Sequence, residues 1–223
     1  MKIAIFYHVH PVYNWITQYN EQIHRVCSSR LYHAADFIHV GFNSHDLHLP
    51  YEIDKVKLHR NNVFHDEFDT LTSLYNFCIS NKGYNVLYFS NLGVTKPNNI
   101  FKSSWRMLLE YFIIDNWKQC NELLNNYDCV GAESHFGVLD FRPQSLGRDF
   151  YMPHYSGNWW WATSDYIATL KTNSIDRENQ NNSRENGEYW IGTGQNVKHY
   201  NLYSSGYYGM LHENIVKPTD YIN

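Results

Sequence analysis

The segment from His154 to Ala162 brings together residue types that could hold a sugar. It contains small hydrogen-bonding residues, a glycine and three consecutive tryptophans. Indole faces cover the apolar C–H faces of a pyranose, hydroxyl and amide groups bond its hydroxyls, and glycine lets a ligand approach the backbone. The residues expected to line such a wall are His154, Ser156, Gly157, Asn158, Trp159 and Trp160. The alternative is a tryptophan-rich strand packed in the core, which composition alone favours slightly.

Glu188 is the candidate for a catalytic carboxylate. It directly follows residues 172–187, which are rich in Asn, Arg, Glu and Ser and almost free of apolar side chains, and it precedes the apolar run 189–191. This composition predicts a mobile surface loop. A loop that delivers a carboxylate to an ordered segment suits a lid that closes on a substrate. An ordinary strand start after a solvated loop explains the same pattern.

Histidines and cysteines raise the question of a metal site. His8 and His10 are spaced so that both would lie on one face of a strand, but the plainer interpretation is a pair of polar side chains at a strand end. The four cysteines, Cys27, Cys78, Cys120 and Cys129, are far apart and form no C-x-x-C pair. Reduced, mostly buried thiols are expected, and neither zinc binding nor a metal-dependent hydrolase is supported.

Composition limits the architecture and the partners. A chain of 223 residues, 43% of them hydrophobic, can bury one substantial core, so residues 1–223 are expected to form a single domain. The net charge is -4 and the lysines and arginines are scattered, which argues against a nucleic-acid partner. No apolar run reaches membrane-spanning length, and the start lacks the layout of a signal peptide. A soluble, cytoplasmic protein is expected.

Strand and helix patterns alternate along the chain. Apolar runs predict strands at 3–7, 37–42, 56–59, 86–89 and 129–132. Helical periodicity predicts helices that start after Asn14, at Asp69 or Thr70, and at Ser103. This order predicts an α/β fold with a mainly parallel sheet and helices on both faces.

Ligands of open parallel sheets bind beyond the carboxyl ends of the strands. Residues 8–13, residues 90–96 and the region around His154 should therefore meet over one edge. Neither a dinucleotide-binding G-x-G-x-x-G nor a P-loop motif follows the first strand.

An ordered set of short motifs carries a resemblance to a known family. In chain order they lie at 2–7, 30–36, 67–71, 87–97, 105–107, 127–131, 154–162 and 188–191. The set resembles small glycosyltransferases of the nucleotide-diphospho-sugar transferase superfamily, with a GT-A (Rossmann-like) fold, found in bacterial polysaccharide clusters and large DNA viruses. For a viral member, the compartment would be the host cytoplasm.

The resemblance implies transfer of a sugar from a nucleotide-sugar donor to a glycan or another hydroxyl acceptor. Glu188 would be the base of an inverting displacement, with Glu185 and Asp165 as alternatives. Transfer requires deprotonation of the acceptor and stabilisation of a departing diphosphate. The donor nucleotide and its phosphates would lie against His8, His10, Tyr13, Glu67, Ser90, Asn91, Lys96 and Arg106.

The loop after the 86–89 strand departs from the family pattern. Ser90-Asn91-Leu92 stands where members usually carry His-Thr-Lys and where many GT-A enzymes place a metal-binding Asp-x-Asp. A divalent metal is therefore doubtful, and no other cofactor is implied. A non-catalytic carbohydrate-binding or degenerate transferase-like module is the alternative function. Such a module should ignore free UDP or GDP.

Overall fold

Strand β1 (Lys2–Val9) lies inside the sheet and is buried on both faces. Ile3, Ile5 and Tyr7 pack in one core, whereas Ala4 and Phe6 pack in the other. A strand covered on both faces needs a continuous apolar run rather than an alternating one, which is the pattern at 3–7. The computed structural model, which describes residues 2–42, 54–60, 67–136, 153–176, 185–207 and 210–222, confirms this predicted strand.

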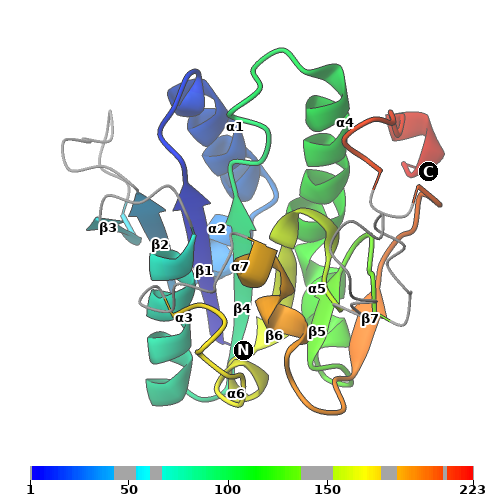
Figure 1. Ribbon diagram of the computed structural model, residues 1–223. Coiled ribbons are helices and arrows are strands. Elements are labelled where there is room, and N and C mark those ends of the chain that lie inside the picture. The colour runs from blue at the N-terminus through cyan, green and yellow to red at the C-terminus, as the bar shows by residue number, and fades with distance from the viewer. Residues whose placement is uncertain are drawn as a thin grey trace.

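The sheet is mixed but mainly parallel, with the order β3-β2-β1-β4-β6-β5-β7 (Figure 1). The other strands are β2 (Phe37–Phe42), β3 (Val56–Arg60), β4 (Tyr84–Ser90), β5 (Cys129–Gly131), β6 (Trp160–Thr163) and β7 (His199–Asn201). Only β6 is reversed: it pairs antiparallel with β4 and β5, and the remaining pairs are parallel. The predicted α/β architecture is confirmed, whereas the insertion of β6 between β4 and β5 was not predicted.

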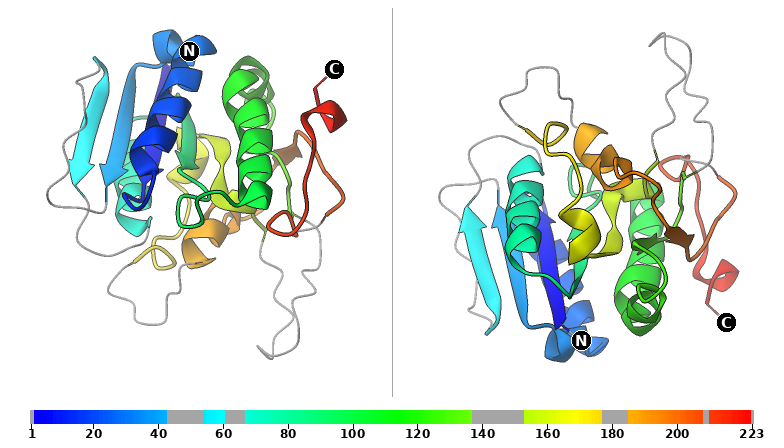
Figure 2. Two further views of the ribbon diagram at one scale, coloured as in Figure 1. Left: turned by 90° about the horizontal axis from the view of Figure 1, so that it is seen from above. Right: turned by 90° about the horizontal axis from the view of Figure 1, so that it is seen from below.

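Helices cover both faces of the sheet, as the views along it show (Figure 2). One face carries α1 (Trp15–Ser28), α2 (Leu31–Ala34), α4 (Ile100–Leu109), the π-helical segment η1 (Glu110–Asp115) and α5 (Trp117–Leu123). The other carries α3 (Phe68–Ser80), α6 (Ser164–Ile167) and α7 (Glu185–Tyr189). Short 3-10 turns lie at η3 (Ser156–Asn158), η4 (Trp190–Gly192) and η5 (Pro218–Asp220).

Two of the three predicted helix starts differ from the observed ones: α3 begins at Phe68 rather than at Asp69 or Thr70, and α4 begins before Ser103. The helix expected from Ser103 begins at Ile100, because the side chain of Asn99 accepts a hydrogen bond from the Lys102 amide at 2.9 Å. It is also not continuous, since η1 interrupts it. Asn14 precedes α1 as expected, but its side chain makes no capping bond.

Three further expectations can be placed on the structure. All four cysteines are free thiols, and three of them are buried. Residues 177–184 of the expected mobile loop at 172–187 lie outside the described residues, and residues 185–187 form the start of α7. No helix in the described ranges combines the length and the apolar character needed to cross a membrane.

Candidate functional site

The strand order reverses direction between β1 and β4, because the chain adds β2 and β3 on one side of β1 and β4 on the other. Ligands of open α/β sheets bind at such a switch point. Asn91 links the loops that follow β1 and β4: its Oδ1 accepts a hydrogen bond from the backbone amide of His10 at 2.9 Å, and its Nδ2 donates to the His10 carbonyl at 2.9 Å. The Asn91 amide also donates to the His8 carbonyl. The loops after β1 and β4 therefore meet as expected.

His8 ties this junction to helix α3. Its Nδ1 lies 2.9 Å from the hydroxyl of Thr70, and both side chains are buried. Tyr13, by contrast, is 74% exposed, and no described contact joins it to the junction.

Glu67 lies just before α3 and anchors a buried polar network. Its Oε2 accepts from the hydroxyl of Tyr88 at 2.6 Å, and its Oε1 accepts from Asn158 Nδ2 at 3.0 Å. Asn158 also donates to the Gly187 carbonyl and accepts from the Trp160 indole at 2.7 Å. Sequence reasoning missed Tyr88, because a tyrosine inside an apolar strand has the pattern of a core residue.

Glu188 joins the same region from α7. Its Oε1 accepts a hydrogen bond from the backbone amide of Gly157 at 3.2 Å. Gly157 has φ of 76°, and a Cβ there would lie 3.0 Å from Leu109 and 3.1 Å from Trp105, so only glycine fits without strain. The backbone of this turn thus presents an amide to the carboxylate. The structure brings together Glu67, Gly157, Asn158 and Glu188, which the sequence placed in three separate segments.

Asp165 and Glu185 were the alternative carboxylates. Asp165 lies in α6, where it is paired with Lys82 at 3.7 Å. Because β6 runs antiparallel, α6 follows it at the opposite edge of the sheet from Asn91. Asp165 therefore cannot serve this site. The backbone of Glu185 is in the first turn of α7.

His154 lies next to the network in a stack of rings. Its imidazole is parallel to that of His135, with centroids 4.4 Å apart, and it meets Tyr189 edge-on at 4.9 Å. Both histidines are buried. Ser156 is buried beside them, and its amide donates to the carbonyl of Glu133. His135 was not predicted, because nothing in its sequence neighbourhood sets it apart from the other histidines.

Gly192 holds α7 against this stack. A Cβ at Gly192 would overlap the carbonyl oxygen of Pro153, so the chain after α7 touches the backbone just before His154. This close approach places the residues that follow Glu188 directly against the His154 segment.

The expectation that Trp159 and Trp160 form a sugar-stacking wall is wrong for this structure. Both indoles are 0% exposed. Trp160 stacks on Tyr88 at 5.2 Å, and Trp159 meets Phe89 edge-on at 5.3 Å while donating to the Ser90 hydroxyl. Trp159 packs in the core on one face of the sheet and Trp160 in the core on the other, so both belong to the core, the alternative that the sequence left open.

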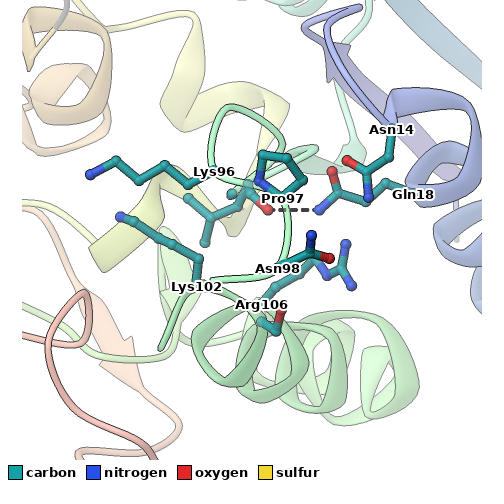
Figure 3. A pocket seen from close by; sticks show the side chains of 10 residues that line it. Asn14, Gln18, Lys96, Pro97, Asn98, Lys102 and Arg106 are labelled. Atoms are coloured by element: carbon teal, nitrogen blue, oxygen red, sulfur yellow. Dashed lines mark hydrogen bonds between the residues drawn. The ribbon is translucent and has the colours of Figure 1, made fainter. Parts of the chain in front are cut away.

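Lys96 and Arg106 are not part of the polar network that contains Glu67 and Glu188. Both line a pocket between α1 and α4, on the other face of the sheet from α3 and α7 (Figure 3). The predicted donor-binding residues therefore divide into a group around His8, Glu67 and Asn91 and a second, cationic group.

The residues at the metal position of many GT-A enzymes do not fit a divalent cation. Ser90 and Leu92 offer no carboxylate, and both amide atoms of Asn91 are engaged by His10. Magnesium and manganese prefer carboxylate and phosphate oxygens. Elsewhere in the described ranges, no three or more His, Cys, Asp or Glu side chains are grouped so that they could hold a metal.

Comparisons with known proteins place the chain in a family without assigning it an activity. Among solved structures, the chain is similar to a crystal structure of 4-diphosphocytidyl-2C-methyl-D-erythritol synthase, with a TM-score of 0.39 and 11% sequence identity over 99% of this chain and 95% of that one. No curated protein matches the sequence. A family model described as a domain of unknown function, DUF8361, matches residues 19–209, and the chain therefore belongs to that family.

Proposed function

We propose that this protein transfers a sugar from a nucleotide-sugar donor to a hydroxyl of a glycan or another acceptor, with Glu188 as general base. The observation that carries this proposal is the polar network at the β1–β4 switch point. There Asn158 donates hydrogen bonds to Glu67 and to the carbonyl of Gly187. The neighbouring residues of the same two segments are also joined, because the Gly157 amide donates to Glu188. Carboxylates and amides that converge where open sheets bind ligands are suited to hold and activate a polyhydroxylated substrate.

Glu188 has the surroundings that a base needs. Its side chain is partly exposed, and the Gly157 amide fixes the direction of the carboxylate. In a single displacement, Glu188 would take the proton of the acceptor hydroxyl while the oxygen of that hydroxyl forms a bond to the anomeric carbon. The bond from that carbon to the donor phosphate oxygen breaks, and the nucleoside diphosphate leaves with the electron pair, inverting the anomeric centre.

Glu67 and Asn158 are better placed to position than to react. Each oxygen of Glu67 already accepts a hydrogen bond, from Tyr88 and from Asn158. A carboxylate can accept about four hydrogen bonds, so Glu67 retains the capacity to accept one from a ribose or sugar hydroxyl. His8 and Thr70 border the same edge and complete the proposed nucleotide side of the site.

Ligand-induced stabilisation tests this proposal. Thermal melts with UDP, GDP, dTDP and the corresponding nucleotide-hexoses should show a concentration-dependent rise for at least one of them, about 3–6 °C at ten times its dissociation constant. Glu67→Gln should reduce that rise, because it removes the charge that holds Asn158. If none of these ligands shifts the melting temperature at millimolar concentration, the protein is not a nucleotide-sugar transferase.

The second candidate function is a carbohydrate-binding module that does no chemistry. The engagement of Asn91 by His10 favours it, since both polar atoms of the Asn91 side chain are then bonded to the backbone of His10 and not directed to a departing diphosphate. This module would be stabilised by free oligosaccharides and would not respond to free nucleoside diphosphates. The same series of melts separates the two functions.

A further inference from the structure

A pocket between α1 and α4 combines three cationic side chains with several neutral polar groups (Figure 3). Its lining residues are Asn14, Gln18, Leu92, Gly93, Lys96, Pro97, Asn98, Lys102, Ser103 and Arg106. None of them is a carboxylate. The empty volume is about 290 Å³, part of which is open to solvent.

The cations are held in place by different means. Arg106 lies 3.4 Å from Glu21 and 3.5 Å from Glu110, but Glu110 is shared with Arg25 at 2.9 Å. The Lys102 ammonium lies 4.4 Å from the centre of the Trp105 indole, which fixes the lysine stem along the pocket wall.

Lys96 and the start of α4 add further positive potential. Lys96 is exposed and makes no ion pair within the described ranges. The pocket includes the first turn of α4, where the helix dipole presents its positive end. An anion entering from solvent would therefore meet Lys96, Lys102 and the helix start together.

Gln18 supplies an independent indication of a ligand. The residue is only 4% exposed, and its Nε2 donates to the Leu92 carbonyl at 2.8 Å. Its Oε1 is buried and accepts a hydrogen bond from no described residue. Figure 3 shows this side chain reaching from α1 toward the 92–98 loop. A buried acceptor without a donor is costly, and a ligand hydroxyl would satisfy it.

We propose that this pocket binds the phosphate group of a small phosphorylated ligand that also carries hydroxyls, as a sugar phosphate does. The cations would hold the phosphate, and Gln18 Oε1 would accept from a ligand hydroxyl. The site is distinct from the polar network around Glu188, because none of Glu67, Gly157, Asn158 and Glu188 lines this pocket. The proposal therefore does not depend on the proposed transferase function.

Calorimetric titration tests the phosphate site. The probes are inorganic phosphate, glucose 1-phosphate and UDP, each at constant ionic strength set with potassium chloride. Lys96→Gln should weaken binding of inorganic phosphate and glucose 1-phosphate about three- to tenfold, as expected for the net contribution of one hydrogen bond at a solvent-exposed site. Because Lys96 is exposed, this variant should fold normally.

Lys118→Gln is the matched control for Lys96→Gln, since it removes the same charge from an exposed lysine of α5 that does not line the pocket. Lys118 lies 16 residues after the pocket residue Lys102 in the helical run, about 24 Å away at 1.5 Å per residue. This control should bind all probes like the wild type. Gln18→Met should abolish the preference for glucose 1-phosphate over inorganic phosphate while leaving phosphate binding intact.

The UDP titration identifies the source of the phosphate. If UDP competes with glucose 1-phosphate and Lys96→Gln lowers the affinity for UDP, the pocket takes nucleotide phosphates. If Lys96→Gln lowers the affinity for glucose 1-phosphate but not for UDP, the pocket takes sugar phosphates. The proposal is overturned if no probe binds at 10 mM, roughly the weakest affinity of interest. It is equally overturned if Lys96→Gln and Lys118→Gln bind every probe alike.

Discussion

Asn158 donates a hydrogen bond from Nδ2 to Oε1 of Glu67 across 3.0 Å, joining residues 91 positions apart. The Trp160 indole holds the other end of the Asn158 amide, and the Tyr88 hydroxyl holds the other oxygen of Glu67. Trp160 therefore supports the candidate site through its indole N–H group, although the faces of its ring are buried.

Glu188→Gln should separate binding from chemistry. Glutamine keeps the hydrogen bond from the Gly157 amide but cannot take a proton, so donor affinity should survive while turnover falls about 100- to 10,000-fold. Release of UDP, GDP or dTDP from the corresponding nucleotide-hexoses measures turnover, and calorimetry measures affinity. Glu122→Gln, at an exposed carboxylate of α5, is the matched control. Near-normal turnover in Glu188→Gln would remove this residue from the mechanism.

Trp160→Ala should act on stability. The indole is fully buried against Tyr88, so its removal should lower the free energy of unfolding by about 3–5 kcal/mol. It also leaves Asn158 without a partner for Oδ1. Chemical denaturation checks this outcome, with Trp160→Phe expected to be milder. A variant of normal stability that binds sugar poorly would restore Trp160 to the ligand site.

Donor binding should persist without divalent metal. The Ser90-Asn91-Leu92 loop supplies no carboxylate, and the Asn91 amide is already bonded to His10. The affinity for the nucleotide that stabilises the protein should change less than about twofold between EDTA and millimolar manganese. A change of this size is well below the tenfold change that corresponds to about 1.4 kcal/mol. Loss of binding in EDTA that manganese restores would point to metal ligands outside the described residues.

His39 should make the fold sensitive to acid. Burial and, to a lesser extent, the neighbouring His59 together lower the pKa of His39 from 6.5 to about 4, and the His39 ring stacks on Phe6 at 4.9 Å. The folded state favours the neutral ring, so the stabilisation is present above pH 6.5 and is lost as the pH falls toward 4. The loss should be on the order of 2 kcal/mol, less than the full ~3 kcal/mol because the ring is partly exposed.

His39→Phe keeps the stack and removes the titrating group. The variant should lose part of the decline in stability between pH 6.5 and 4, measured by urea denaturation across that window. His33→Phe, at an exposed histidine of α2, is the control and should keep the wild-type profile. An unchanged profile in His39→Phe would mean that other groups carry the acid sensitivity.

The sequence by itself determined five of the seven strands that the structure describes, and the class of fold. The run at 3–7 is apolar without alternation because both faces of β1 are covered, and the prediction at 37–42 coincides with β2. The convergence of the 8–13 and 90–96 loops also followed from the sequence, since parallel strands end at one edge. These features depend on local periodicity and chain order, which a single sequence contains.

Only the tertiary structure decided which residues face a ligand. An indole that packs in a core and one that stacks on a sugar have the same local pattern, and the packing of helices on both faces of the sheet buried Trp159 and Trp160. The same holds for Lys96 and Arg106, which the fold placed in a pocket with Gln18 rather than beside Glu188. Side-chain contacts between segments 70 to 90 residues apart depend on how the layers pack, and no local signal in the chain encodes that choice.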